Sequence, residues 1–549
     1  MARLYFRRVR LLVLILAITV TAAHGADPSK ILRITFQAAE TGFDPVKVSD
    51  YYSGTVIEAI FDPLLTYDYL ARPARLVPNT AAALPQISDQ GRTYRVSVKP
   101  GIHFADDAVF KGKKRELTAL DYAYSIGRFL DPKNRSPYAF MFEGIAAIET
   151  PDRHTLVIRL KQPDLNFSHV LAFSLSGAVA REAIEHYGDE SAAKPVGSGP
   201  FRLKSYTRSS KIVLEANPGY REVMRDGARL PRIGGVEISI MEETQSRWLA
   251  FQRGDTDIEY QLSEVAPTFI TAEGQLKAEF ARRGIKLERS VDPEITYLYF
   301  NMQDKTLGGL SKEKIALRRA IAMAYKVEDQ IRIIRKGQSI RAHYPIPPGV
   351  AGHDPQYRSS IVHDPRAANA LLDKFGYRKG ADGYRRLPGG AALAIRYSST
   401  PSERDRQFDE LMKRSLDSIG VRLEIHKDRF PELIKLENQC RLMMRGAAWI
   451  ADYPDGDNFM QLAYGPNTGQ SNNACYRSPE YDRRYQRSRL LPDGPERNRL
   501  YREMARIMET DTVWLLTDSR YRNVLMQPRV KGFTKHPVLH AEWLYIDLE

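Results

Sequence analysis

The sequence lacks the short motifs that mark the common catalytic sites. Its 549 residues contain no His-Glu-x-x-His, no Gly-x-Ser-x-Gly, no Gly-x-x-x-x-Gly-Lys-Ser/Thr and no Gly-x-Gly-x-x-Gly after a predicted strand. The 11 histidines show no spacing with acidic residues that is typical of a metal site. We therefore expect a protein that is not an enzyme and that holds no metal or other cofactor.

Blocks of like charge, internal repeats and low-complexity tracts are also missing. Charged residues make up 27% of the chain, both signs alternate along it, and the net charge is +14. A diffuse excess of this kind is typical of a solvated surface and not of a nucleic-acid-binding face. We expect no nucleic acid among the partners.

Long apolar runs are rare, and the run at the N-terminus, residues 11–20, is short. A membrane-spanning helix needs about 20 apolar residues, so a transmembrane anchor is the weaker alternative. Four arginines precede this run and small residues up to Gly25 follow it, an order typical of a signal peptide. Arg7 and Arg8 leave twin-arginine export open, although the residues after them fit that signal poorly. The predicted mature protein starts after Gly25, carries a net charge of +10 and is periplasmic.

Cysteine is nearly absent, with Cys440 and Cys475 alone. In an oxidising compartment two cysteines pair by default, and this bond would close a loop of about 34 residues. Two buried free thiols are the alternative. Either way, two cysteines are too few for an unaided structural zinc site.

Hydrophobic periodicity predicts strands that alternate with helices. The predicted strands cover residues 31–36, 93–98, 154–160, 201–206, 211–215, 236–240, 296–301, 422–426, 441–449, 513–516 and 524–527. The predicted helices cover residues 52–65, 117–129, 180–187, 244–253, 314–324, 327–335, 365–375, 403–419 and 495–508. Thr118 is the expected N-cap of its helix, with Asp121 three residues later. This alternation indicates an α/β protein with partly parallel sheets.

Several short segments form an ordered set that extends over nearly the whole mature chain. They include Leu76-Val77-Pro78-Asn79-Thr80-Ala81, Val196-Gly197-Ser198-Gly199-Pro200-Phe201, Asn217-Pro218-Gly219-Tyr220, Tyr299-Phe300-Asn301 and Trp449-Ile450-Ala451-Asp452-Tyr453-Pro454-Asp455. This set resembles the dipeptide- and oligopeptide-binding family of ABC-importer solute-binding proteins (family 5). The sequence departs from the family pattern at Ala105-Asp106-Asp107 and by an insertion at residues 110–115.

The resemblance implies a bilobal α/β fold of the periplasmic-binding-protein type II class, with an additional inserted domain and two hinge crossings. Residues 26–70, 198–295 and 513–549 would form the first lobe, residues 71–197 its inserted smaller domain, and residues 296–512 the second lobe. The hinge strands are expected near Thr296 and at residues 511–515. Residues 1–25 are the predicted signal peptide. The ligand would bind in the cleft between the lobes, which would close by a hinge movement.

The function that the resemblance implies is the periplasmic substrate-binding component of an ABC importer. Such a protein would bind di- or oligopeptides and deliver them to the membrane permease subunits, and we expect it to be a monomer. The same fold could instead receive a metal chelate, haem, an oligosaccharide or an antibiotic. A function of a different class, an exported hydrolase, is the further alternative.

Five residues are the candidates for binding the ligand. The resemblance places Asp452 where the family has the carboxylate that pairs with the ligand's α-amino group, and Trp449 would wall the same pocket. Tyr299 and Asn301 end the strand that enters the second lobe, and Tyr52 lies at the start of the first helix. Core packing of Tyr299 and surface placement of Tyr52 are the alternatives. Nearby Asp455 and Asp457 compete with Asp452, which could instead cap a helix.

Overall fold

The structure, a computed structural model, describes residues 25–72, 74–260 and 262–549. The predicted signal peptide therefore lies outside the described residues, apart from Gly25. Strands and helices alternate along the chain, as the periodicity predicts. The largest element is a twelve-stranded sheet whose main path runs in the order β18-β17-β19-β15-β20-β13-β1-β12-β9-β8. No helix in the described ranges has the length and apolarity to cross a bilayer.

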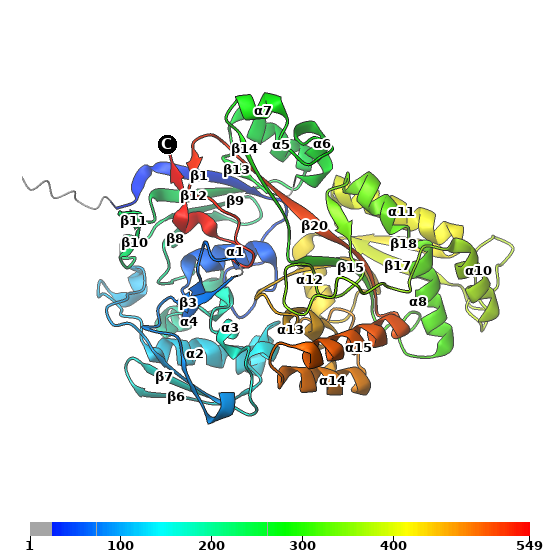
Figure 1. Cartoon of the computed structure of the whole chain (residues 1–549), viewed down its shortest axis with the longest axis horizontal. Coiled ribbons are helices and arrows are strands. Elements are labelled where there is room, and N and C mark those ends of the chain that lie inside the picture. The colour runs from blue at the N-terminus through cyan, green and yellow to red at the C-terminus, as the bar shows by residue number, and fades with distance from the viewer. Residues whose placement is uncertain (1–24, 73, 261) are drawn as a thin grey trace, which may run out of the picture.

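One half of this sheet lies around the N-terminal strand, on the left in Figure 1. Its parallel central pair, β1 and β12, buries Leu32, Ile34, Val236 and Ile238 because alternate residues face the core. The strands of this half are β1 (Asp27–Phe36), β8 (Phe201–Thr207), β9 (Lys211–Ala216), β12 (Ile233–Ile240), β13 (Ile258–Glu259) and β14 (Lys286–Val291).

The other half, on the right in Figure 1, is covered by the long helices of the C-terminal part of the chain. Its strands are β15 (Glu294–Phe300), β16 (Ser339–Arg341), β17 (Ala394–Ser399), β18 (Arg422–Lys427) and β19 (Met444–Ile450). The covering helices are α8 (Lys312–Ala324), α10 (Pro365–Lys374) and α11 (Glu403–Ser418). Their apolar faces form a separate core that includes Leu317, Leu372 and Leu416.

The strand β20 (Trp514–Met526) joins the two halves. Its first residues pair with β15 and β16, and its last residues pair with β14 and β13. The prediction of two separate strands at 513–516 and 524–527 is therefore wrong. Polar residues interrupt the hydrophobic pattern between them, but the charged ones are paired: buried Asp518 accepts from Gln330 at 2.6 Å, and half-buried Arg520 forms an ion pair with Glu294.

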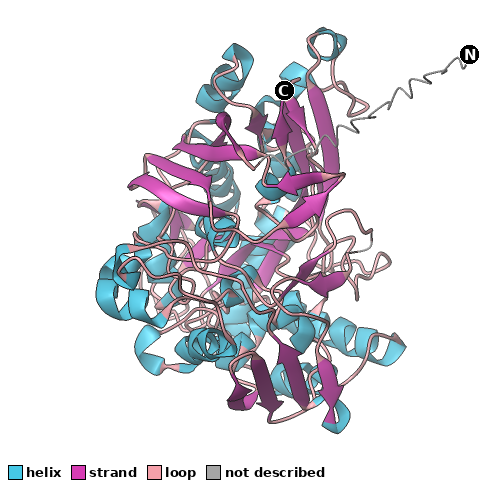
Figure 2. Cartoon of the chain, turned by 90° about the vertical axis from the view of Figure 1, so that its left-hand side faces the viewer, coloured by secondary structure: helices cyan, strands magenta, loops and turns pink. Residues whose placement is uncertain are grey.

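A separate four-stranded sheet lies within residues 86–160, visible at the lower end of Figure 2. Its order is β4 (Gln86–Ser88), β5 (Thr93–Ser97), β7 (Thr155–Leu160) and β6 (Ile145–Asp152). The helices α2 (Ala119–Leu130) and α4 (Arg181–Tyr187) belong to the same region. The expected N-cap of α2, Thr118, is confirmed; it forms a capping box, in which the backbone N–H of Thr118 donates to Asp121 at 2.7 Å. The domain boundaries stay a prediction.

The helix α1 (Tyr51–Ile60) begins the wall of the central cleft. Its N-cap, Asp50, accepts a hydrogen bond from the Ser53 N–H at 2.8 Å. The helix ends earlier than predicted because Gly199 donates its N–H to the Ile60 carbonyl at 2.8 Å. A Cβ at Gly197 would lie 2.0 Å from that same carbonyl oxygen. The Gly197-Ser198-Gly199 segment is thus a close backbone contact with α1.

The expected disulfide between Cys440 and Cys475 is confirmed, with a Cα–Cα distance of 6.1 Å. It ties the end of α12 (Phe430–Asn438) to the segment before α14 (Pro479–Arg489), two helices that the periodicity did not predict. The predicted last helix is α15 (Pro495–Asp511). The remaining elements are β2 (Leu65–Tyr67), β3 (Leu76–Pro78), β10 (Val223–Arg225), β11 (Ala228–Leu230), β21 (Val530–Lys531), β22 (Asp547–Leu548), α3 (Phe167–Val170), α5 (Thr244–Arg253), α6 (Ala266–Phe269), α7 (Ala278–Arg282), α9 (Val327–Asp329) and α13 (Asp457–Met460).

Candidate ligand-binding site

Two adjoining cavities open between the halves of the molecule. The first has a volume of about 1280 Å³ and the second about 1800 Å³, open solvent included. Both are lined by Asp50 and Tyr51 at the start of α1, by Tyr138, and by Trp449 at the end of β19. A concave space of this size with both aromatic and charged walls is typical of a small-molecule site.

Trp449 and Tyr138 face each other where the cavities meet. Their ring centroids lie 6.2 Å apart, although the residues come from opposite sides of the cleft. The Trp449 indole N–H donates to the Asn458 side-chain oxygen at 3.1 Å, which holds the ring at the end of its strand. Tyr138 is 6% exposed, and its hydroxyl has no hydrogen-bond partner in the described part of the chain.

Asp452 lines the first cavity, directly after β19. The amide of Asn458 donates to its carboxylate at 2.9 Å, and the Asp452 N–H donates to the Asn458 oxygen at 2.9 Å. No described cation forms an ion pair with Asp452. Burial therefore raises the pKa of Asp452 to about 7, against the weaker effect of the Asn458 hydrogen bond. This carboxylate is positioned to receive a cation and has none of its own.

The two competing acids near Asp452 are already paired. Asp455 accepts two hydrogen bonds from the guanidinium of buried Arg497, at 2.6 and 2.9 Å. Asp457 accepts from the Tyr453 hydroxyl at 2.8 Å. Neither lines the two cavities. Asp455 and Asp457 thus hold the loop in place, and of the three acids only Asp452 faces the open space.

The other predicted site residues fall into two groups. Tyr52 lines the second cavity and packs against Phe430 with ring centroids 6.2 Å apart. Tyr299 and Asn301 are buried and line neither cavity. The Asn301 amide donates to the carbonyls of Cys440 and Leu442, at 2.7 and 2.8 Å, so its contacts join β15 to the segment before β19.

The second cavity contains cationic side chains that the sequence analysis did not single out. Its lining includes five arginines, and three of them form ion pairs with carboxylates of other segments: Arg445 with Glu437 at 2.7 Å, Arg335 with Asp518 and Arg520 with Glu294. The remaining two are Arg404, which forms an ion pair with its neighbour Asp405, and Arg429, which forms none with a described residue.

Arg404 and Arg429 keep binding capacity toward the cavity. The Arg404 Nη1 donates to the Gln37 side chain at 3.0 Å, and its nearest carboxylate, Asp405, lies 3.4 Å from Nε. The Arg429 side chain has no hydrogen bond or ion pair within the described ranges. No periodicity or motif marks either residue, so the sequence alone offered no signal for them.

Polar contacts bridge the cleft on both sides of the cavities. On one side the Glu403 N–H donates to the Glu243 carboxylate at 3.2 Å. On the other side Arg489 forms an ion pair with Asp164 at 2.5 Å, and the Phe140 N–H donates to the Gln470 side chain at 2.9 Å. A ligand held between Trp449 and Tyr138 would therefore be largely enclosed.

Comparison with known proteins agrees with this arrangement. Residues 75–471 match the family described as "Bacterial extracellular solute-binding proteins, family 5 Middle". The chain belongs to this family. A relative among curated proteins, "Di/tripeptide-binding protein 2" of Pseudomonas aeruginosa (strain UCBPP-PA14), is 26% identical over 98% of this chain and 98% of its own length.

Solved structures share the fold of this family 5 solute-binding protein. The Helicobacter pylori periplasmic binding protein DppA, in complex with the peptide STSA, has a TM-score of 0.83 at 22% identity and covers 94% of this chain and 98% of its own. NikZ from Campylobacter jejuni, in complex with Ni(L-His), has a TM-score of 0.77 at 17% identity and covers 95% of this chain and 100% of its own. The predicted bilobal α/β fold is confirmed.

Proposed function

We propose that this solute-binding protein is the periplasmic substrate-binding component of an ABC importer, and that it binds di- or oligopeptides between its lobes. The observation that carries the proposal is the division of charge along the cleft. The first cavity is lined by no lysine or arginine and holds Asp452 without a cation, whereas the second is lined by Arg429, which has no ion pair with a described residue, and by Arg404, whose ion pair is with its neighbour Asp405 at 3.4 Å. A free peptide has the complementary pattern, an ammonium at one end and a carboxylate at the other.

The two ends of the peptide would be bound by different parts of the chain. Its ammonium would pair with Asp452, and its backbone would pass between Trp449 and Tyr138. Its carboxylate would reach Arg404 or Arg429, and Tyr52 would contact the chain between them. Charge-assisted hydrogen bonds of this kind are stronger than neutral ones, which gives affinity without contacts to specific side chains. Tyr299 and Asn301 are left with structural roles.

Blocking one end of the ligand at a time tests this proposal. Calorimetric titration of the ligand-free protein with Ala-Ala and Ala-Ala-Ala would be compared with N-acetylated and C-amidated forms. We expect each block to weaken binding by about 10- to 100-fold, since each removes a hydrogen-bonded charge pair. Equal affinity of free and blocked peptides would refute the charge-pairing scheme.

A metal chelate is the second candidate, because the structurally similar NikZ was solved with Ni(L-His). The structure supports this candidate less well, because within the described residues no group of three His, Cys, Asp or Glu side chains is placed to hold a metal ion. A chelate carries its own metal ligands, so the discriminating measurement is direct titration with nickel and L-histidine. Tight binding of that mixture together with no binding of peptides would replace the peptide assignment.

Delivery to the importer completes the proposal. The peptide would pass from the protein to membrane permease subunits when the lobes separate. We propose that the protein acts as a monomer, exported by the predicted signal peptide, and that it captures its ligand and does not hydrolyse it. Incubation with a labelled peptide should return the peptide intact.

A further inference from the structure

The first cavity has a lining of one charge sign. Its wall contains four carboxyl groups, Asp50, Glu58, Asp62 and Asp452, and no lysine or arginine. Asp62 is neutralised by an ion pair with Arg221, which lies outside the lining, at 2.6 Å. None of the other three carboxylates forms an ion pair with a described residue. A ligand with one ammonium group would therefore leave buried negative charge unmatched, which is costly in a low-dielectric site.

Glu58 is the carboxylate best placed for a second positive charge. It lies on α1, the same helix that Asp50 caps, and it lines the first cavity together with Asp452. It accepts hydrogen bonds from the backbone N–H groups of His540 and Ala541, at 3.1 Å each. Burial raises the pKa of Glu58 to about 7, and these bonds oppose that rise. Burial keeps His540 neutral by lowering its pKa well below 6.5, so His540 adds no cation to the wall.

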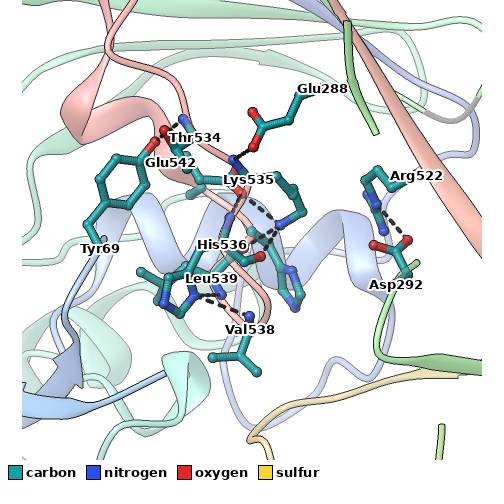
Figure 3. A network of polar contacts seen from close by, with 12 residues as sticks. Tyr69, Glu288, Asp292, Arg522, Thr534, Lys535, His536, Val538, Leu539 and Glu542 are labelled. Atoms are coloured by element: carbon teal, nitrogen blue, oxygen red, sulfur yellow. Dashed lines mark hydrogen bonds and ion pairs between the residues drawn. The ribbon is translucent and has the colours of Figure 1, made fainter. Parts of the chain in front are cut away.

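The segment that Glu58 contacts is itself fixed. Figure 3 shows Lys535 bound to three acceptors: the carbonyls of His536 and Leu539 at 2.6 and 2.8 Å, and the carboxylate of Glu542 at 2.7 Å. Glu288 accepts from the Lys535 N–H at 3.0 Å on the outer side. The segment beside α1 is therefore held by the ion pair between Lys535 and Glu542, and Lys535 forms no ion pair with Glu58, although its charge lowers the Glu58 pKa.

Tyr138 provides independent evidence for a ligand in this cavity. Its side chain is more than nine-tenths buried, lines both cavities, and has a hydroxyl without a partner in the described chain. Asp452, Asp50 and Tyr138 line the same cavity, and the negative charges of the two carboxylates add to burial in raising the pKa of this hydroxyl. A buried polar group normally has a hydrogen-bond partner, and a cationic donor between these groups would supply one. The aromatic walls Tyr67, Phe201 and Trp449 also favour a cation.

We propose that the first cavity selects ligands with a second positive charge beside the terminal ammonium, and that Glu58 binds this second charge. For peptides this means lysine or arginine as the first residue. The inference rests on the proposed function, and it adds a side-chain preference to a scheme that otherwise recognises only the peptide ends.

The test uses peptides that differ in one charge. The full mature protein would be titrated with Lys-Ala-Ala and with two analogues in which the first residue is norleucine or Nε-acetyl-lysine. We expect Lys-Ala-Ala to bind the wild-type protein at least about tenfold more tightly than either analogue. In Glu58→Gln, whose amide oxygen can still accept from His540 and Ala541, the ratio should fall to about one.

A matched variant separates charge from local structure. Glu288→Gln changes a carboxylate that contacts the same segment but lines neither cavity, so its preference for lysine should equal that of the wild type. Equal binding of Lys-Ala-Ala and its analogues to the wild type would overturn the assignment of Glu58 and leave the peptide receptor intact. Loss of the preference in Glu288→Gln would overturn it also. If the wild type binds none of the peptides, the proposed function fails and this inference fails with it.

Discussion

Replacement of Asp452 by asparagine should stabilise the ligand-free protein at neutral pH. Burial raises the pKa of Asp452 from 3.8 to about 7. A carboxyl group whose pKa is higher in the folded state stabilises the fold below its unfolded pKa, and this contribution is lost as pH rises through the folded pKa. Asparagine does not ionise, so the variant should not show this loss.

The size of the effect follows from the two pKa values. One pKa unit corresponds to about 1.4 kcal/mol, so the difference between 3.8 and about 7 gives an upper value of about 4 kcal/mol. Because part of the Asp452 side chain remains in contact with the cavity, we expect about 2 to 4 kcal/mol. The advantage of Asp452→Asn should be small at pH 4, grow up to about pH 7, and change little above it.

Urea unfolding of the ligand-free proteins between pH 4 and pH 8 measures this difference in stability directly. The free energies of unfolding of the wild type and Asp452→Asn would be compared at each pH. We expect the slope of the free energy against urea concentration to be the same in both proteins. A difference that does not vary with pH would refute the reasoning, because it would mean that Asp452 titrates alike in the folded and unfolded chain. A variant that gains stability and loses peptide binding would show that this carboxylate is kept for the ligand at a cost to the fold.

Three further outcomes follow from the same structure. Peptide affinity should fall as pH drops below about 7, by up to about tenfold per pH unit, because the ammonium needs ionised Asp452; calorimetry from pH 5 to pH 8 checks it, and a flat profile would contradict it. Arg497→Met should lower the free energy of unfolding by about 3 to 5 kcal/mol, because it leaves the buried Asp455 carboxylate without its cation. Chemical denaturation measures this, and a loss below about 1 kcal/mol would exclude a structural role for the Arg497–Asp455 ion pair. In the double variant Cys440→Ala, Cys475→Ala the free energy of unfolding should fall by about 3 to 4 kcal/mol, because the disulfide closes a loop with a sequence separation of 35; an unchanged unfolding midpoint would contradict this expectation.

Most elements of the fold could be predicted because local sequence specifies them. The capping box at Thr118 and the apolar positions of α8 depend on residues three or four apart, which a periodic pattern reveals. The continuity of β20 could not be seen in this way. Its middle residues are polar, and the partners that allow their burial, Gln330 and Glu294, are almost 200 or more residues away in the chain.

The missed helix α14 did carry a signal. Its sequence is strongly charged, but Tyr481, Tyr485 and Ser488 are buried at helical spacing. The pattern is too short and too polar to stand out, and packing of these few side chains determines the helix.

The candidate site was predictable only in part. The resemblance singled out Asp452 and Trp449, which do line the cleft. It also singled out Tyr299, which lies two residues beyond Tyr297 on the same face of β15; both are buried, but only Tyr297 lines the second cavity. Glu58 and Arg404 face the cavities only because segments distant in the chain fold against each other, and no local motif records that.

The identity of the molecule carried by the native protein tests the central claim most directly. Mature protein purified gently from an exported source would be weighed by native mass spectrometry, and the mass above that of the polypeptide identified after denaturation. We expect short peptides with free ends, enriched in lysine or arginine at the first position. Release of a sugar, haem or metal complex in place of peptides would contradict the account.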